Sequence, residues 1–298
     1  MLQAKVTIVG LGLMGGSLAL ALRLAQRVAQ RPFPTHITVV DTNPATRRAA
    51  LRLADVVTAD FAEGVAEAEL IILATPVRTV VSLLKELAAV RPDGCMVLDL
   101  GSTKQDICAV MAALPAHFAA LGGHPMCGKE TAGFSSATPD LYRDKTFVLC
   151  RNRRTTARIE ALVLELLTIV GANPLFLPAA VHDEMVAAIS HLPYLVAGSL
   201  LRTAAALDDE RLWTVSASGF RDTSRVSGTD PQMMLDILLT NKTAVLQQLQ
   251  RYQEEITAVT QLLAADDEEN LAAWLAETQA EYVAYREKSD ERWVMSDE

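Results

Sequence analysis

Two polar residues with acid/base or hydrogen-bonding chemistry follow short apolar segments of the chain. Ser102 comes after a segment that ends near Leu100, and His124 comes after one that ends near Leu121. An imidazole whose ordinary pKa is about 6.5 can accept a proton from a hydroxyl group near neutral pH. His124 is therefore the main candidate for an acid/base residue, and the alternative is a structural histidine that holds a loop. Ser102 could hydrogen-bond His124 or a reacting hydroxyl, or it could cap a helix that starts near Lys104, and these roles can coexist.

Three further polar residues could line the same pocket. Lys129 and Glu130 lie a few residues after His124 and could tune the charge of the pocket, or they could be solvated loop residues. His191 precedes Pro193 in a helical run, where the proline removes the backbone donor that would bond Ile189 and should distort the helix. A polar residue at such a distortion often marks a cavity, although a buried histidine satisfied by the backbone is the default interpretation.

A glycine-rich segment near the N-terminus predicts a dinucleotide site. The apolar run Lys5–Val9 leads into the G-x-G-x-x-G fingerprint, which opens a helix. Gly10 permits the tight turn, Gly12 lets a pyrophosphate approach the backbone, and Gly15 lets the helix pack on the sheet. The expected cofactor-binding residues are Gly10, Gly12, Leu13, Met14, Gly15, Asp41, Thr75 and Pro76.

The choice of dinucleotide depends on Asp41, which ends the second apolar run, His36–Val40. A carboxylate at this point can accept hydrogen bonds from both ribose hydroxyls of NAD and would repel the additional phosphate of NADP. NAD is therefore the expected cofactor. Arg47 or Arg48 could instead accommodate a 2′-phosphate.

The elements that must position these residues fall into two classes. Short runs rich in β-branched residues alternate with amphipathic stretches, as in a doubly wound α/β fold with a mainly parallel sheet. The predicted strands are Lys5–Val9, His36–Val40, Leu70–Ala74, Met96–Leu100 and Thr146–Cys150. Ligands of such sheets bind beyond the carboxyl ends of the strands, which is where Thr75, Ser102 and His124 occur.

Helical periodicity replaces the strand pattern from about Pro178 onward. It runs through 181–203, 231–263 and 268–288, which predicts an all-helical second domain. We place a Rossmann-type dinucleotide-binding domain at residues 1–176 and a helical substrate and dimerisation domain at 177–298. The long amphipathic stretches 241–263 and 268–288 exceed the needs of a small lobe, so they are expected to bury a shared face in a homodimer, or else to pack within one chain.

Composition narrows the possible partners. The 298 residues carry a formal charge of -9, with 27 Lys and Arg scattered among 36 acidic residues, which argues against nucleic acid. In the sequence pattern no apolar stretch reaches the roughly 20 residues that cross a bilayer, and there is no signal-peptide organisation, so we expect a cytoplasmic protein without a membrane partner. The four cysteines have no metal-ligand spacing, and no metal site is expected.

Several motifs together resemble the prephenate/arogenate dehydrogenase family. They are Gly10–Ser17, Asp99–Asp106, Gly123–Glu130, Ser190–Pro193 and Gly219–Arg225, so the resemblance covers nearly the whole chain. It implies that His124 takes the proton of the C4 hydroxyl as hydride passes from C4 to NAD and the ring carboxylate leaves as carbon dioxide. It also implies that Ser102 orients His124, that Arg225 binds a substrate carboxylate, and that His191 belongs to the substrate pocket.

Other functions remain open at this point. Another two-domain dehydrogenase, for a hydroxyacid or an imine, would share the glycine loop and the helical partner domain. A non-catalytic NAD sensor would not need His124, Ser102 and Arg225 together. The sequence does not decide between prephenate and arogenate, because these substrates differ only in a keto group or a charged amine on the side chain.

Overall fold

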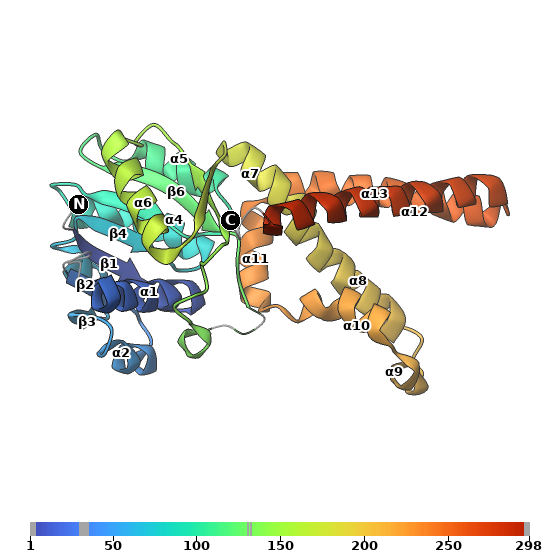
Figure 1. Cartoon of the computed structure of the whole chain (residues 1–298), viewed down its shortest axis with the longest axis horizontal. Coiled ribbons are helices and arrows are strands. Elements are labelled where there is room, and N and C mark those ends of the chain that lie inside the picture. Colours follow the sequence, from blue (N-terminus) through green and yellow to red (C-terminus); the bar gives the residue numbers. More distant parts are fainter. Residues whose placement is uncertain (1–3, 30–35, 130, 132, 295–298) are drawn as a thin grey trace. The chain divides into compact units, whose positions relative to one another are not determined.

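The computed structural model describes residues 4–29, 36–129, 131 and 133–294, and its central element is an eight-stranded sheet. The strand order is β3-β2-β1-β4-β5-β6-β7-β8, and all neighbours are parallel except β6 and β7. The strands are β1 (Lys5–Val9), β2 (His36–Val40), β3 (Val56–Thr58), β4 (Leu70–Leu73), β5 (Met96–Asp99), β6 (Ala119–Pro125), β7 (Thr146–Cys150) and β8 (Asn173–Phe176). The predicted α/β class is confirmed (Figure 1).

Helices cover both faces of this sheet and bury its apolar side chains. On one face α1 (Leu13–Ala29) and α6 (Ala157–Val170) pack over a core that includes Ile8, Ile72 and Leu98. On the other face α4 (Val77–Val90) and α5 (Gln105–Ala113) pack over Ile71 and Leu73, among others. Because neighbouring residues of one strand point to opposite faces, the strands are apolar at nearly every position, which is the pattern that made them visible in the sequence.

The five predicted strands are present, and three more complete the sheet. The additional strands are β3, β6 and β8. β3 has only three residues, β6 contains two glycines and a histidine, and β8 contains Pro174 and lies largely exposed, so none has the buried β-branched pattern on which the prediction relied. Short helices α2 (Pro44–Ala50), α3 (Phe61–Val65) and η1 (Phe134–Ser136) fill connections between the longer elements.

The chain leaves the sheet through a continuous helical segment over residues 179–205. It consists of α7 (Ala179–Val186), one π-helical turn η2 (Ala187–His191) and α8 (Leu192–Ala205). In the π turn the N–H of Leu192 bonds the carbonyl of Ala187, five residues earlier. The distortion expected from Pro193 is therefore present as a π turn, a feature frequent at functional sites.

The same segment corrects one expectation from the sequence. By length and composition, residues 179–205 are apolar enough to cross a membrane, and the described residues contain this one such helix. The sequence reading missed it because Pro193 and the polar triplet His182-Asp183-Glu184 break up the apolar run. Both His182 and Asp183, near the start of this segment, are buried, and Asp183 accepts the backbone N–H of Lys104 in the sheet half of the protein.

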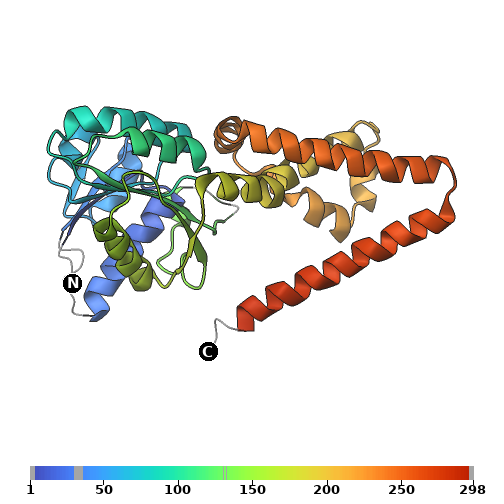
Figure 2. The same cartoon turned by 90° about the horizontal axis from the view of Figure 1, so that it is seen from above.

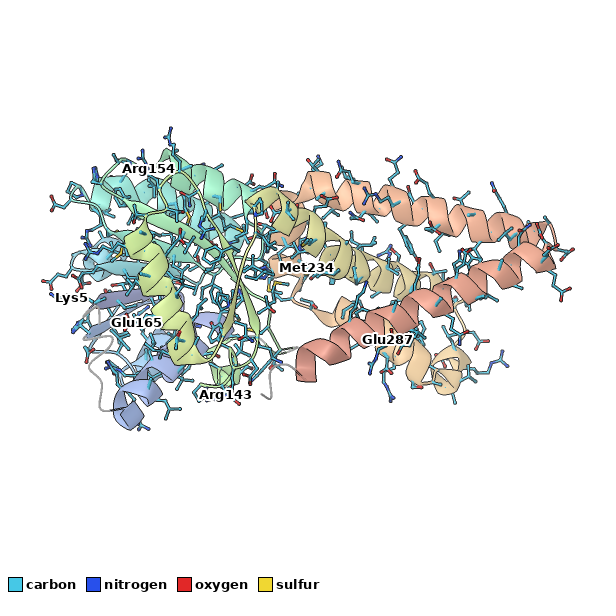
Figure 3. The ribbon with its side chains drawn as sticks, turned by 45° about the horizontal axis from the view of Figure 1, so that its top comes forward. Lys5, Arg143, Arg154, Glu165, Met234 and Glu287 are labelled. Atoms are coloured by element: carbon cyan, nitrogen blue, oxygen red, sulfur yellow. The ribbon has the colours of Figure 1, made fainter. Side chains whose placement is uncertain are left out.

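Helix α11 (Pro231–Thr240) ties the helical segment to the sheet half. It packs against α4, where Arg78 and Asp236 form an ion pair at 3.7 Å, and the hydroxyls of Thr240 and Thr103 lie 2.9 Å apart. Met234 on the same helix is buried, 6% exposed (Figure 3). Between α8 and α11 lie α9 (Arg211–Val215), α10 (Ser218–Ser224) and η3 (Arg225–Gly228).

The chain divides into two compact units, residues 1–245 and 246–298. The second unit contains most of α12 (Lys242–Ala264) and all of α13 (Glu268–Val294), two long helices that diverge from the turn joining them (Figure 2). Its apolar side chains are largely exposed, among them Leu263, Leu275 and Tyr282. The compact units divide the chain after Val245, while the domain boundary near residue 176 remains a prediction.

Candidate active site

The glycine loop after β1 has the geometry of a phosphate cradle. Gly10 adopts a φ of 90°, and a Cβ on Gly15 would lie 2.0 Å from the carbonyl oxygen of Gly10, so neither position accepts a larger residue. A Cβ on Gly12, in contrast, would meet nothing within 4 Å. Gly12 thus borders open space at the N-terminus of α1, where the helix has no acidic residue in its first turn to oppose an anion.

Asp41 stands beside this loop at the carboxyl end of β2. Its carboxylate accepts hydrogen bonds from the backbone N–H of Leu11 (2.8 Å) and of Asn43 (2.8 Å). Arg47 donates to the carbonyls of Asp41 and Thr42, so its guanidinium is held at the same corner. The structure therefore places the two residue types that would discriminate ribose from ribose phosphate side by side.

Thr75 and Pro76 follow β4 next to the glycine loop. The hydroxyl of Thr75 is buried and has no hydrogen-bond partner among the described residues, which is a costly state for a protein atom unless a ligand or water meets it. Its Cγ2 would lie 2.8 Å from a Cβ placed on Gly10. The open cradle at Gly12, the carboxylate of Asp41 and this orphaned hydroxyl fit the pyrophosphate and sugar of a dinucleotide.

His124 lies near the carboxyl end of β6, and an ion pair from the neighbouring strand fixes its backbone. Asp99 Oδ1 accepts the N–H of Gly123 (3.1 Å), and Lys104 Nζ donates to the carbonyl of the same residue (2.7 Å). Asp99 and Lys104 also bond each other directly, and both side chains are fully buried. Both backbone polar groups of Gly123, the residue before His124, are thereby held by one buried pair.

A second set of contacts fixes the imidazole of His124. Its Nδ1 lies 2.8 Å from Nε2 of His182, and Nδ1 of His182 lies 2.7 Å from Oδ1 of Asp183. Asp183 also accepts the backbone N–H groups of Lys104 (2.7 Å) and Gln105 (2.9 Å), so it caps the N-terminus of α5. Helix α7 thus supplies two hydrogen-bonded side chains, of Asp183 and His182, that connect the N-terminus of α5 to His124, the candidate base.

The protonation states follow from these surroundings. Burial lowers the pKa of His124 well below its ordinary value, and the adjoining His182, Lys104 and His191 lower it further. Burial raises the pKa of Asp183, but the hydrogen bonds from His182, Gln105 and Lys104 outweigh this effect and hold it below the ordinary value. At neutral pH His124 is therefore an uncharged base and Asp183 a carboxylate.

His191 extends the cluster from the π turn. It is buried, and its Nδ1 lies 3.2 Å from Nδ2 of Asn241, which also donates to the carbonyl of Asp183. Burial lowers the pKa of His191 to about 4, with His182 acting in the same direction and Asp183 opposing. The imidazoles of His124, His182 and His191 therefore gather at this point, and the Asn241 Oδ1 beside them has no partner in the described part of the chain.

The remaining predicted residues are placed less closely together. Ser102 is half-buried in the loop after β5, and among the described residues no hydrogen bond joins it to His124 or caps α5. Lys129 is exposed and donates to Ser136 and Thr138. Arg225 begins η3 with an exposed side chain, and Glu130 lies outside the described residues. The roles expected for these four residues stay predictions.

The sequence reading missed the residues that hold His124. His182 and Asp183 stand in an Ala- and Val-rich helix, and an adjacent pair of ionisable residues in such a run is the available signal. Asp99 and Lys104 lie inside a motif that was noted, but their spacing alone does not reveal that they pair. Long-range contacts such as His124 to His182, 58 residues apart, are not encoded in local periodicity.

The fold and this site define a nicotinamide-dependent dehydrogenase of two parts, one that binds NAD and one that is helical. Two family profiles match the chain: "Prephenate dehydrogenase, nucleotide-binding domain" over residues 24–175 and "Prephenate dehydrogenase, dimerization domain" over 178–277. The chain therefore belongs to the prephenate dehydrogenase family.

Individual relatives agree with this assignment. The chain is 33% identical over 280 residues to a prephenate dehydrogenase of Bacillus subtilis, covering 90% of this chain and 73% of that one. It also superimposes on the prephenate dehydrogenase of Aquifex aeolicus in complex with hydroxyphenyl propionate and NAD+, with a TM-score of 0.86, 28% identity and coverage of 96% and 99%. A Synechocystis arogenate dehydrogenase matches with a TM-score of 0.78, 29% identity and coverage of 94% and 99%. The predicted enzyme class and the NAD cofactor are confirmed.

Proposed function

We propose that this enzyme oxidises and decarboxylates prephenate to 4-hydroxyphenylpyruvate with NAD as hydride acceptor, a step toward tyrosine. The observation that carries the proposal is the placement of His124, a neutral and partly buried imidazole near the carboxyl end of β6, in a chain whose two parts both match the prephenate dehydrogenase family. Arogenate is the second candidate, because one structural relative is an arogenate dehydrogenase.

The residues of the chain would act mainly on the proton and on the substrate's charge. His124 accepts the proton of the C4 hydroxyl, which becomes a carbonyl as the C4 hydride leaves. Loss of the ring carboxylate as carbon dioxide returns its electron pair to the ring, and the oxygen regains a proton as the ring becomes aromatic. NAD supplies the hydride acceptor when it is bound in the cradle of the glycine loop.

Arg225, Ser102 and His191 complete the proposed substrate site. Arg225 is proposed to bind a substrate carboxylate, for which a planar guanidinium offers two parallel donors. Ser102 at the end of β5 is proposed to hydrogen-bond the reacting hydroxyl or His124. His191 is proposed to line the pocket from the π turn, with Lys129 and Glu130 adjusting its charge.

We further propose that the enzyme is a homodimer. The match to a dimerization domain over 178–277 supports this, as do the exposed apolar side chains along α8, α12 and α13, for example Leu201, Ile256 and Leu275. Apolar faces of this extent in a globular protein normally meet another surface.

The test is a steady-state assay with prephenate and arogenate, each with NAD and NADP, on the unmodified protein and on His124→Asn. We expect turnover of prephenate with NAD, and a fall in kcat on the order of 100-fold or more in the variant, with NAD affinity nearly unchanged. His117→Asn, at an exposed histidine just before the amino end of β6, is the matched control. Lack of turnover on either substrate by the unmodified protein would refute the proposal.

A further inference from the structure

The side chain of Asp183 starts a hydrogen-bonded chain whose donors and acceptors can be assigned in one way when the two imidazoles in it, of His124 and His182, are uncharged. Asp183 is fully buried, and its two oxygens accept the N–H groups of Lys104 and Gln105 and face Nδ1 of His182. With backbone donors on both oxygens, the group is held as a carboxylate and can only accept. Nδ1 of His182 must therefore carry a hydrogen.

The assignment then passes to His124. A neutral His182 with a hydrogen on Nδ1 has an unprotonated Nε2, which can only accept. The atom 2.8 Å away is Nδ1 of His124, so this nitrogen must be the donor. In a neutral imidazole the remaining nitrogen, Nε2 of His124, then carries a free electron pair.

The other charged and titratable groups around the ring do not compete for its Nδ1. Lys104 directs its ammonium to Asp99 and to the carbonyl of Gly123. His191 is paired through its Nδ1 with Asn241. His182 is thus the partner that the described residues give to Nδ1 of His124.

We propose that His182 and Asp183 are positioning residues that hold His124 in the Nδ1–H tautomer, with Nε2 directed to the substrate, and that stabilise its protonated form during turnover. The proposal rests on the proposed function for its catalytic part, because it assumes that His124 is the base. When Nε2 takes the substrate proton, the positive charge on the ring is stabilised through His182 by the carboxylate of Asp183, without any net transfer to that carboxylate.

The tautomer can be measured without any substrate. The chain has five histidines, so imidazole 15N labelling gives few signals, and those of His124 and His182 are assigned by substitution. We expect both rings of the unmodified protein to carry their hydrogen on Nδ1 at neutral pH. A hydrogen on Nε2 of His124 would overturn the proposal, whether or not the protein turns over prephenate.

Two substitutions of one residue test the catalytic consequence. His182→Gln can still accept the Nδ1 hydrogen of His124, whereas His182→Leu leaves that nitrogen without an acceptor. We expect kcat to fall on the order of 100-fold for leucine and no more than about tenfold for glutamine, with KM and NAD affinity changed less than about threefold in both. His117→Gln and His117→Leu serve as controls at an exposed histidine.

The outcomes separate this proposal from the function itself. Equal kcat for His182→Leu and the unmodified protein would overturn it, as would equal losses in both variants that follow their thermal stability. If the leucine variant does not fold, the glutamine variant and the NMR spectrum of the unmodified protein still decide. Inactivity of the unmodified protein on both substrates would count against the proposed function and leave the tautomer result standing.

Discussion

Two buried networks meet at His124, and they solve the problem of burying charge in different ways. On the sheet side, Asp99 and Lys104 form an ion pair that also hydrogen-bonds the backbone N–H and C=O of Gly123. On the helical side, Asp183 is a carboxylate that accepts hydrogen bonds from two backbone N–H groups and faces the imidazole of His182, and the part of the chain that the structure describes bonds no Lys or Arg to it. The first network fixes where the backbone of His124 lies, and the second fixes how its ring is protonated.

Because of this difference, we expect one network to determine the stability of the protein and the other to determine its catalytic rate. A closed ion pair is satisfied at all times, so its removal exposes a buried, unpaired charge in the resting protein. The imidazole chain is satisfied by hydrogen bonds between two imidazoles and one carboxylate, and it gains a positive charge when His124 takes a proton. Substitutions in the first network should therefore act on folding, and those in the second on turnover.

The largest effect is expected for Lys104→Met, which leaves the carboxylate of Asp99 without its cation. The free energy of unfolding should fall by about 3–5 kcal/mol, as for other broken buried pairs. Urea denaturation followed by circular dichroism measures it, and Lys85→Met at an exposed position of α4 is the control. The double variant Asp99→Asn/Lys104→Met should recover part of the loss, and a double variant as unstable as the single one would contradict the ion-pair explanation.

The second prediction concerns the stability of the protein in acid, which depends on His191 on the helical side. The pKa of His191 is lowered to about 4 in the folded protein, from an ordinary value near 6.5. The unfolded chain therefore binds the proton more readily, and stability that is complete above pH 6.5 falls as the pH drops toward 4. The loss should reach about 3 kcal/mol from this residue. Urea unfolding at pH 7 and pH 4.5, compared with His191→Gln, tests it, and parallel losses in both proteins would exclude His191 as the cause.

Asp183→Asn is expected to act mainly on turnover. An amide has one acceptor oxygen in place of two, so it cannot serve Lys104, Gln105 and His182 together, and the tautomer of His124 is released. The value of kcat should fall on the order of 100-fold, while the loss of the cap costs about 1–2 kcal/mol of stability. The exposed neighbour Glu184→Gln is the control. An unchanged kcat in a folded Asp183→Asn protein would contradict the expectation that the helical-side network acts on turnover.

The smallest of these effects is expected outside both networks, at Arg225, whose side chain is exposed in η3. If it binds a substrate carboxylate, Arg225→Ala should raise KM about 30-fold, the equivalent of roughly 2 kcal/mol, and leave the unfolding free energy within about 0.5 kcal/mol. Initial rates over a range of substrate concentrations measure the change. Arg225→Lys should recover little of the loss, and an unaltered KM for Arg225→Ala would transfer the role to Arg221.

The sequence revealed the parts of the fold that local patterns determine. Continuous apolar strands such as Leu70–Leu73 and the glycine fingerprint were found because their signals lie within a few residues. β6 was only partly recognised, since Gly122, Gly123 and His124 interrupt its apolar pattern. The reversal of β7 against β6 has no local signature either, because it depends on the path of the chain between them.

For the site, the sequence indicated the reacting residue but not its support. His124 could be identified from its residue type and its place after a strand, and Asp41 and Thr75 from the same rule. The resemblance to a known family added Arg225 and assigned His191, which the Pro193 distortion had already indicated, to the substrate pocket. The pairing of His182 with His124 and the cap that Asp183 places on α5 depend on tertiary packing, which no spacing within one segment predicts.

The cap that Asp183 provides has a consequence for the order in which the protein assembles during synthesis. The sheet strands β1 to β8 end at Phe176, so the sheet half can be completed on the ribosome before His182 and Asp183 have emerged. Until then the N–H groups of Lys104 and Gln105 lack the acceptor that they have in the finished protein, and the ring of His124 lacks its neighbour. A nascent chain would thus acquire its nucleotide cradle first and its oriented base later, when α7 docks. We expect released residues 1–176 to bind NAD more readily than they oxidise any substrate.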